Sequence, residues 1–215
     1  MASSCPIRGV VFDMDGTLTL PGSIDFAAMR ARISAPHGVD VLDHIEAHDD
    51  IRERARLHSI IEDEEEVGFH RQQLMPDATV LLDALTSYSL HLAVVTRNNE
   101  GVMKRTLALF ERPSAFSVTL SRSFSPGKPH PAPIHHICSV WSCNPQNVVM
   151  VGDSRDDILC GLAAGARTIL VGSPGQFGYD DALPLADASV QNLSSIISVL
   201  QSWNSSLSTG AKGNV

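Results

Sequence analysis

Short, evenly apolar runs alternate with longer amphipathic stretches over most of this 215-residue chain. Apolar runs rich in Val, Ile and Leu are typical of strands buried on both faces, and apolar positions every three or four residues are typical of helices. This alternation favours a parallel sheet flanked by helices, an α/β fold. The expected strands are Val10 to Phe12, His91 to Thr96, Phe116 to Leu120, Val148 to Val151 and Thr168 to Val171, and the expected helices include Ala78 to Tyr88, Asn99 to Phe110 and Pro131 to Trp141.

The stretch from residue 20 to residue 75 interrupts this alternation. It is poor in strand patterns, rich in Ala, Arg, Asp and Glu, and has helical candidates at Ile24 to Ile33 and Asp50 to Glu66. We interpret it as a small inserted α-helical cap that leaves the main body just after the first strand. The predicted organisation is a core of residues 1–19 and 76–204, a cap of residues 20–75 and a disordered tail of residues 205–215, which lacks apolar periodicity.

Two carboxylates, Asp13 and Asp15, directly follow the first predicted strand. Ligands in open α/β sheets bind beyond the carboxyl ends of strands, so both acids are expected in a crevice. The pair repels itself unless a cation or protons balance it, which favours a hard metal with oxygen ligands. A calcium-binding loop is excluded, because Leu18 and Ile24 stand where that loop needs Gly and Glu. For this segment alone, a solvated turn remains an alternative.

Three more predicted strands end in polar residues. Thr96 precedes a helix whose first backbone N–H groups suit a phosphate oxygen, and Lys128 stands just before a proline-stiffened helix start. Asp153 ends the fourth strand, and Asp156 and Asp157 follow as a helix begins. Each segment also has an ordinary structural interpretation, as a helix cap, a loop lysine or acids that complement a helix dipole.

Composition narrows the classes of partner. The formal net charge is −8, which gives no electrostatic footprint for nucleic acid or for an anionic membrane surface. No apolar stretch approaches the roughly 20 residues that a transmembrane helix needs. The four cysteines form no Cys-x-x-Cys pair and no secretory signal is recognisable, so we expect a cytoplasmic protein, with an organelle left open. No pattern determines the oligomeric state, and a monomer is favoured.

Taken jointly, these strand-end residues give the sequence a resemblance to the haloacid dehalogenase (HAD) superfamily, specifically to its phosphatase branch. The resemblance covers roughly residues 8 to 200 and implies a Rossmann-like core with a helical cap inserted between the first two motifs. The four family motifs match Asp13-Met14-Asp15-Gly16-Thr17, Thr96, Lys128-Pro129-His130-Pro131 and Gly152-Asp153-Ser154-Arg155-Asp156-Asp157.

The resemblance implies catalytic roles for four residues. Asp13 is the expected nucleophile, which forms an aspartyl-phosphate, and Asp15 is expected to protonate the leaving alcohol and then to activate water. Thr96 and Lys128 are expected to bind the transferring phosphoryl group. Because dehalogenases of this superfamily lack the second aspartate, Asp15 argues against dehalogenation.

The resemblance also implies a Mg²⁺ ion as cofactor. Its expected ligands are Asp13, the backbone carbonyl of Asp15 and Asp153, with Asp157 in or near the metal shell. The family spacing selects Asp157 over Asp156 as the second acid of the fourth motif.

The resulting functional hypothesis is a Mg²⁺-dependent phosphatase that hydrolyses a small phosphomonoester. A phosphomutase with the same aspartyl-phosphate chemistry and a non-catalytic scaffold with this fold are the alternatives. Thr17, Arg97 and Asn98 are the expected substrate-binding residues. The substrate is expected to be a small phosphorylated metabolite, and nothing in the residues ranks sugar, glycolate, glycerol, nucleoside or vitamin phosphates.

Overall fold

The computed structural model describes residues 6–36, 39–176 and 178–204. The chain divides into two compact units. The core unit comprises Met1–Leu20 and Leu74–Val215, and the inserted unit comprises Pro21–Gln73. The expected tail, residues 205–215, lies outside the described residues. The assignment of residues 20–75 as a cap stays a prediction.

The core unit contains a six-stranded parallel sheet with the order β3-β2-β1-β4-β5-β6. From β1 the chain proceeds outward to β2 and β3, then returns across the sheet to β4, on the other side of β1. The strand order therefore reverses between β1 and β4, which is where open α/β sheets form their ligand crevices. The strands are β1 (Gly9–Phe12), β2 (His91–Val95), β3 (Phe116–Leu120), β4 (Val148–Gly152), β5 (Arg167–Val171) and β6 (Ala188–Val190).

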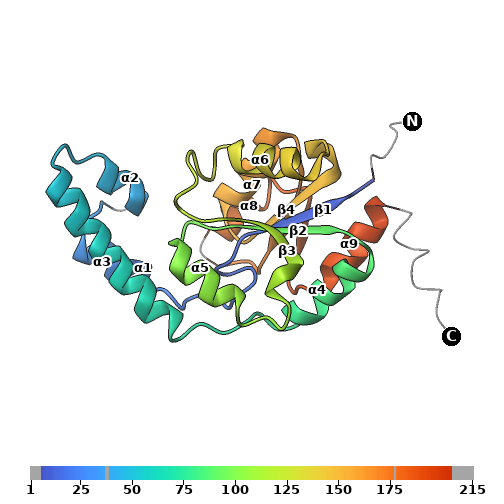
Figure 1. Ribbon diagram of the computed structural model, residues 1–215, viewed down its shortest axis with the longest axis horizontal. Helices are drawn as coiled ribbons and strands as arrows, with labels where there is room; N and C mark the ends of the chain where they lie inside the picture. Colours follow the sequence, from blue (N-terminus) through green and yellow to red (C-terminus); the bar gives the residue numbers. More distant parts are fainter. Residues whose placement is uncertain (1–5, 37–38, 177, 205–215) are drawn as a thin grey trace. The chain divides into compact units, whose positions relative to one another are not determined.

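Helices cover both faces of this sheet, which is why its central strands are continuously apolar. Every residue of β1 and β4 is buried. In Figure 1, α6 and α7 lie on one side of the strands, and α4 and α9 lie on the other. The expected Rossmann-like α/β fold is confirmed. The helices of the core unit are α4 (Ala78–Ser87), α5 (Glu100–Leu107), α6 (Ala132–Trp141), α7 (Arg155–Ala164), α8 (Tyr179–Ala182) and α9 (Ser195–Trp203), with short 3₁₀ turns at Pro113–Ala115 and Pro145–Asn147.

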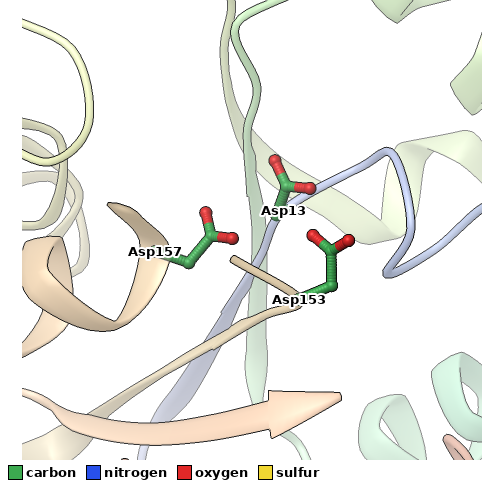
Figure 2. Close-up of side chains that lie close together, drawn as sticks. All are labelled: Asp13, Asp153 and Asp157. Carbon is green, nitrogen blue, oxygen red and sulfur yellow. The ribbon is translucent and has the colours of Figure 1, made fainter. Parts of the chain in front are cut away.

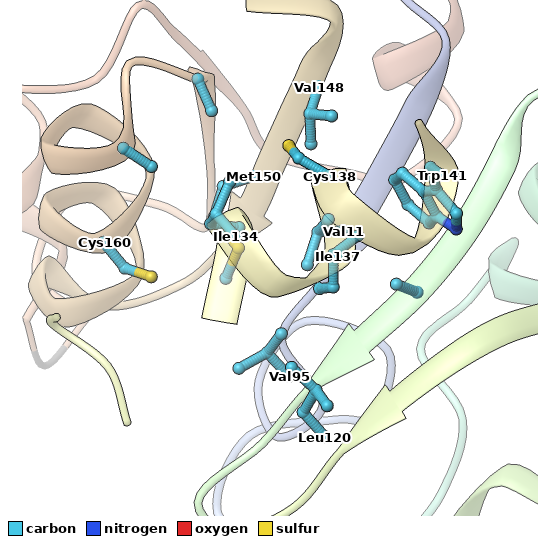
Figure 3. Close-up of a cluster of buried hydrophobic side chains, with 13 residues drawn as sticks. Val11, Val95, Leu120, Ile134, Ile137, Cys138, Trp141, Val148, Met150 and Cys160 are labelled. Carbon is cyan, nitrogen blue, oxygen red and sulfur yellow. The ribbon is translucent and has the colours of Figure 1, made fainter. Parts of the chain in front are cut away.

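A cluster of buried side chains joins α6 and α7 to the sheet (Figure 3). Ile134 and Ile137 of α6 are fully buried in it, together with Val11 of β1 and Met150 of β4. The two isoleucines are three residues apart, so they lie on one face of the helix. This packing fixes α6 above the two strands that end at the switch point.

The close approach of α6 to β1 requires a glycine. A Cβ atom at Gly9 would lie 2.3 Å from the ring of Trp141, so only glycine leaves room for the indole. The indole N–H of Trp141 donates to Ser117 Oγ at 2.9 Å, which satisfies its only polar group.

One strand and three α-helices of the described structure, β6, α2 (Val41–Glu46), α8 and α9, have no counterpart among the elements expected from the sequence. Strand β6 has only three residues, Ala-Ser-Val, too few to form an apolar run. Helix α2 has only six residues, too few for a clear helical period. Helix α8 has only four residues, and the helical pattern of the nine-residue α9 was not recognised. Helix α5 also ends earlier than expected, at Leu107, because the amides of Leu109 and Phe110 bond to carbonyls three residues back and tighten the chain into turns.

The inserted unit has an apolar cluster of its own. It consists of α1 (Phe26–Arg32), α2 and α3 (Ile51–Phe69). Each helix begins after an aspartate, Asp25, Asp40 or Asp50, whose side chain accepts a hydrogen bond from a first-turn amide. The buried side chains of this cluster are Ile24, Met29, Ile33, Val41, Ile45, Leu57 and Ile61.

We predict that Ile137→Ala destabilises the protein by about 2–5 kcal/mol, because it leaves a cavity between α6 and the sheet. Val140→Ala is the matched control on the same helix, since Val140 is 55% exposed whereas Ile137 is 0% exposed. The control is expected to change the unfolding free energy by less than about 0.5 kcal/mol. Urea denaturation followed by circular dichroism measures both, and equal losses would contradict this account of the core.

Candidate active site

Two neighbouring strands bring the first and fourth motifs together. Asp13 follows β1, and its backbone N–H donates to the Val151 carbonyl of β4 at 2.9 Å. Asp153 follows β4 directly. The two acids therefore lie at the carboxyl ends of the adjacent strands where the strand order reverses.

Three carboxylates converge at this position. Asp13, Asp153 and Asp157 each offer one oxygen, and these oxygens all lie within 4.8 Å of one another. Figure 2 shows the three side chains directed toward a common space, Asp157 from the first turn of α7 and the other two from strand ends. We call these three residues the acid triad.

Lys128 supplies a positive charge to the acid triad from the loop between β3 and α6. Its buried ammonium donates to Asp13 Oδ1 and, at 2.6 Å, to Asp157 Oδ1. One ammonium faces three carboxylates, so a fully ionised cluster carries an excess of two negative charges.

The pKa values of these groups reflect the excess of negative charge. Burial raises the pKa of Asp13 well above its ordinary value and outweighs the opposing effect of Lys128, while the neighbouring acids raise it further. Burial and then the charge of Asp157 raise the pKa of Asp153 to about 7. Burial on its own would lower the pKa of Lys128, but Asp13 and Asp157 raise it above its ordinary value. The ammonium is thus permanently charged and does not fully compensate the acids.

The acid triad fits a divalent cation. Carboxylate oxygens are the ligands that hard cations such as Mg²⁺ and Ca²⁺ take. A charge of +2 would balance the two negative charges that Lys128 leaves uncompensated.

Two glycines make room for the acids of the fourth motif. Gly16 has φ +79°, and a Cβ atom there would lie 2.1 Å from Asp153 Oδ2. A Cβ atom at Gly152 would lie 2.2 Å from the Cβ of Asp157. Substitution at either position must displace a carboxylate of the triad.

Asp157 also caps the helix on which it stands. Its Oδ2 accepts from the Ser154 backbone N–H at 3.1 Å and from the Ser154 hydroxyl at 2.6 Å. Its other oxygen accepts from Lys128. Neighbouring Asp156 lies apart from the triad and pairs with Arg97, Nη1 to Oδ2, at 3.2 Å.

The side chain of Asp15 has different partners from the triad. Its Oδ2 accepts a hydrogen bond from the amide Nδ2 of Asn98, and its Oδ1 lies 3.5 Å from the Thr19 hydroxyl. Thr96 is buried at the end of β2, and its Oγ1 accepts from the Asn98 backbone N–H at 3.2 Å. The loop after β2 therefore reaches the loop after β1 through Asn98.

The three expected substrate-binding residues have different surroundings. Arg97 is about one-third exposed, Asn98 is buried against Asp15, and Thr17 is fully buried. The Thr17 hydroxyl has no hydrogen-bond partner within the described part of the chain. The roles of all three in substrate binding stay predictions.

Sequence reasoning missed two contacts of the site. The Asn98–Asp15 contact joins residues 83 positions apart, and no local pattern reveals it. The Ser154–Asp157 contact does have a local signal, because a hydroxyl residue followed three positions later by an acid resembles a capping box.

Comparison with known proteins identifies the family. Residues 30–171 match the family described as haloacid dehalogenase-like hydrolase, a range that includes Thr96, Lys128 and Asp153 and begins after Asp13. The chain belongs to this family. Membership in this family makes the protein a hydrolase.

Individual relatives agree with this membership. A haloacid dehalogenase-like hydrolase domain-containing protein of Arabidopsis thaliana is 42% identical over 187 residues, which cover 81% of this chain and 75% of the relative. A phosphoglycolate phosphatase of Mannheimia succiniciproducens is 33% identical over 117 residues, 54% of this chain and 50% of that protein. The crystal structure of a predicted phosphoglycolate phosphatase from Haemophilus somnus has the same fold, with a TM-score of 0.71 at 22% identity, over 93% of this chain and 100% of that one.

Within the described residues, no helix combines the length and the apolar character needed to cross a bilayer.

We predict that Gly16→Ala weakens divalent-cation binding at least tenfold, because the new Cβ displaces Asp153. Gly165→Ala is the matched control, since Gly165 has a similar φ of +80° with nothing within 4 Å of the added Cβ. Both substitutions introduce about 1–2 kcal/mol of backbone strain, but only Gly16→Ala is expected to lower the affinity for the cation. Isothermal titration with Mg²⁺ measures the difference, and equal affinities would show that Gly16 does not maintain the triad.

Proposed function

We propose that the protein is a Mg²⁺-dependent phosphatase that hydrolyses a small phosphomonoester through an aspartyl-phosphate on Asp13. The observation that carries this proposal is the convergence of the acid triad and the Lys128 ammonium at the ends of β1 and β4. The broader class, a hydrolase of phosphoric monoesters, follows from the family and its phosphoglycolate phosphatase relatives.

The first chemical problem is charge. A phosphomonoester is dianionic near neutral pH, so an attacking carboxylate is repelled unless cations offset the repulsion. Lys128 contacts Asp13 and is permanently charged, so it supplies part of this compensation. A carboxylate oxygen of Asp13 then forms a bond to phosphorus while the bond between phosphorus and the ester oxygen breaks.

Asp15 transfers the proton in both steps of the reaction. It gives a proton to the departing ester oxygen and then takes one from the water that attacks the aspartyl-phosphate. Its side chain is held outside the acid triad, which supports a role separate from metal ligation by that side chain.

Mg²⁺ would be held by Asp13, the backbone carbonyl of Asp15 and Asp153, with Asp157 in or near the shell. When bound, the ion supplies positive charge that offsets the repulsion between phosphate and carboxylate. Asp157 already binds Lys128 and Ser154, so we assign to it mainly the positioning of Lys128.

Thr96 and Lys128 would bind the transferring phosphoryl group. The Thr96 oxygen accepts from the Asn98 backbone, which leaves its own hydroxyl hydrogen available as a donor to a phosphoryl oxygen. Arg97, which is partly exposed on the same loop, is a candidate contact for the rest of the substrate.

The inserted unit, Pro21–Gln73, would act as the cap that excludes water and selects the substrate. Its position in the sequence, between Asp15 and Thr96, supports this assignment. Phosphoglycolate is the first substrate to test, since relatives bear that name. The described cysteines Cys138, Cys143 and Cys160 are free thiols, which supports a cytoplasmic location.

We predict that Asp13→Asn abolishes phosphate release, by more than about a thousandfold, because the amide cannot act as the nucleophile. Asp156→Asn is the matched control, an acid near the triad but paired with Arg97, and it is expected to retain most activity. Release of inorganic phosphate from a panel of phosphorylated metabolites, with Mg²⁺ and with EDTA, measures both.

Activity that survives Asp13→Asn would overturn the aspartyl-phosphate mechanism. Conversion of a sugar phosphate to its isomer without phosphate release would identify a phosphomutase. No turnover of any compound by the wild-type protein would favour a non-catalytic scaffold.

A further inference from the structure

The contact between Asn98 and Asp15 is the strongest feature of the site that the proposed mechanism does not use. Asn98 is 5% exposed, and its side-chain amide Nδ2 donates to Asp15 Oδ2. We propose that Asn98 is a positioning residue for Asp15, which holds Oδ2 and thereby makes Oδ1 the oxygen that carries the catalytic proton. This inference rests on the proposed phosphatase function.

Asn98 is a rigid anchor because the sheet fixes its backbone. Its N–H donates to Thr96 Oγ1 at 3.2 Å, and its carbonyl accepts from the Arg122 N–H at 2.9 Å. The Thr96 N–H in turn donates to the Leu120 carbonyl, the end of β3, at 2.9 Å. Asn98 is thus tied to the ends of β2 and β3, while Asp15 belongs to the loop after β1. The amide connects the proton carrier to the part of the molecule that holds Thr96.

The chemistry of the two groups determines which oxygen carries the proton. An amide NH₂ donates hydrogen bonds and does not accept them, so the oxygen facing it must keep a lone pair directed at Nδ2. In a neutral carboxyl group the carbonyl oxygen is the better acceptor, so the amide at Oδ2 favours Oδ1 as the oxygen that carries the proton. The Thr19 hydroxyl lies 3.5 Å from Oδ1, but it has a shorter contact of 3.2 Å with the Met14 carbonyl, to which it donates. In the first step Oδ1–H transfers its proton to the ester oxygen as the bond from that oxygen to phosphorus breaks. In the second step Oδ1 takes a proton from water as the water oxygen bonds to phosphorus, the bond between phosphorus and the Asp13 oxygen breaks, and inorganic phosphate and the Asp13 carboxylate are released.

This role differs from the substrate binding expected of Asn98 from the sequence. A side chain that contacts the substrate changes KM and discriminates between substrates by shape. A side chain that orients the acid changes the rate according to how much the leaving group needs a proton. The two roles therefore separate when substrates of similar size differ in their leaving groups.

The test compares kcat/KM for benzyl phosphate and p-nitrophenyl phosphate in wild type, Asn98→Ala and Asn98→Asp. The ester oxygen of benzyl phosphate leaves as a strongly basic alkoxide unless it receives a proton. The ester oxygen of p-nitrophenyl phosphate leaves as nitrophenolate, which is stable without a proton. We expect Asn98→Ala to lower kcat/KM for benzyl phosphate by about 10–100-fold, within the range of general acid catalysis, and for p-nitrophenyl phosphate by less than about threefold. Asn98→Asp keeps the shape of the side chain but places a carboxylate against Asp15. We therefore expect it to lower kcat/KM for benzyl phosphate more than Asn98→Ala does.

Asn99→Ala is the control for damage to the loop. The Asn99 side chain accepts from the Val102 N–H at 2.9 Å and caps α5, so its loss destabilises this loop without removing the Asn98 amide. We expect it to lower the melting temperature but to leave the ratio of the two kcat/KM values unchanged.

Equal losses on both substrates in Asn98→Ala would overturn the positioning role and leave the phosphatase function intact, as would a loss confined to KM. If the wild-type protein hydrolyses neither of the two test substrates nor any metabolite of the panel, the proposed function fails and this inference fails with it.

Discussion

The contact of the Lys128 ammonium with Asp13 and Asp157 is the interaction on which the site depends. It lies in a region closed to solvent, where an uncompensated charge is expensive, and loss of one member of such a buried group costs about 3–5 kcal/mol. The ammonium brings the ends of three segments together, one after β1, one after β3 and one at the start of α7. The ammonium does not neutralise all of the acids, and this remaining negative charge would attract a cation.

The order of the strands explains why these charges meet. Because the chain returns across the sheet between β3 and β4, the strand ends that carry Asp13 and Asp153 are neighbours although 140 positions separate the two residues. Apolar strands with both faces covered hold these ends in place. The two glycines, Gly16 and Gly152, then let the acids approach more closely than side chains would permit.

The sequence was sufficient to predict five of the six strands of the sheet, because buried parallel strands are continuous apolar runs. It also predicts that Asp13, Asp153 and Lys128 lie close together, because strand ends share one edge, and the structure brings them together; their chemical roles stay predictions. Strand β6 and helices α2 and α8 could not be found, since such short elements form only through tertiary packing. Helix α9 was also missed, although it has nine residues and its buried Ile196 and Leu200 lie four positions apart. The Asn98–Asp15 contact was equally hidden, because it depends on where two loops end in space rather than on any local spacing.

Asp157 has two structural duties at once, since one of its oxygens holds Lys128 and the other completes the first turn of α7 through Ser154. A substitution at Asp157 would therefore disturb two things at once, the start of α7 and the position of the Lys128 ammonium, and through Lys128 the proposed reaction. We therefore expect Asp157 to tolerate fewer substitutions than its neighbour Asp156 when such a protein evolves a new reaction. Asp156 forms a partly exposed ion pair with Arg97, and such pairs contribute little to stability.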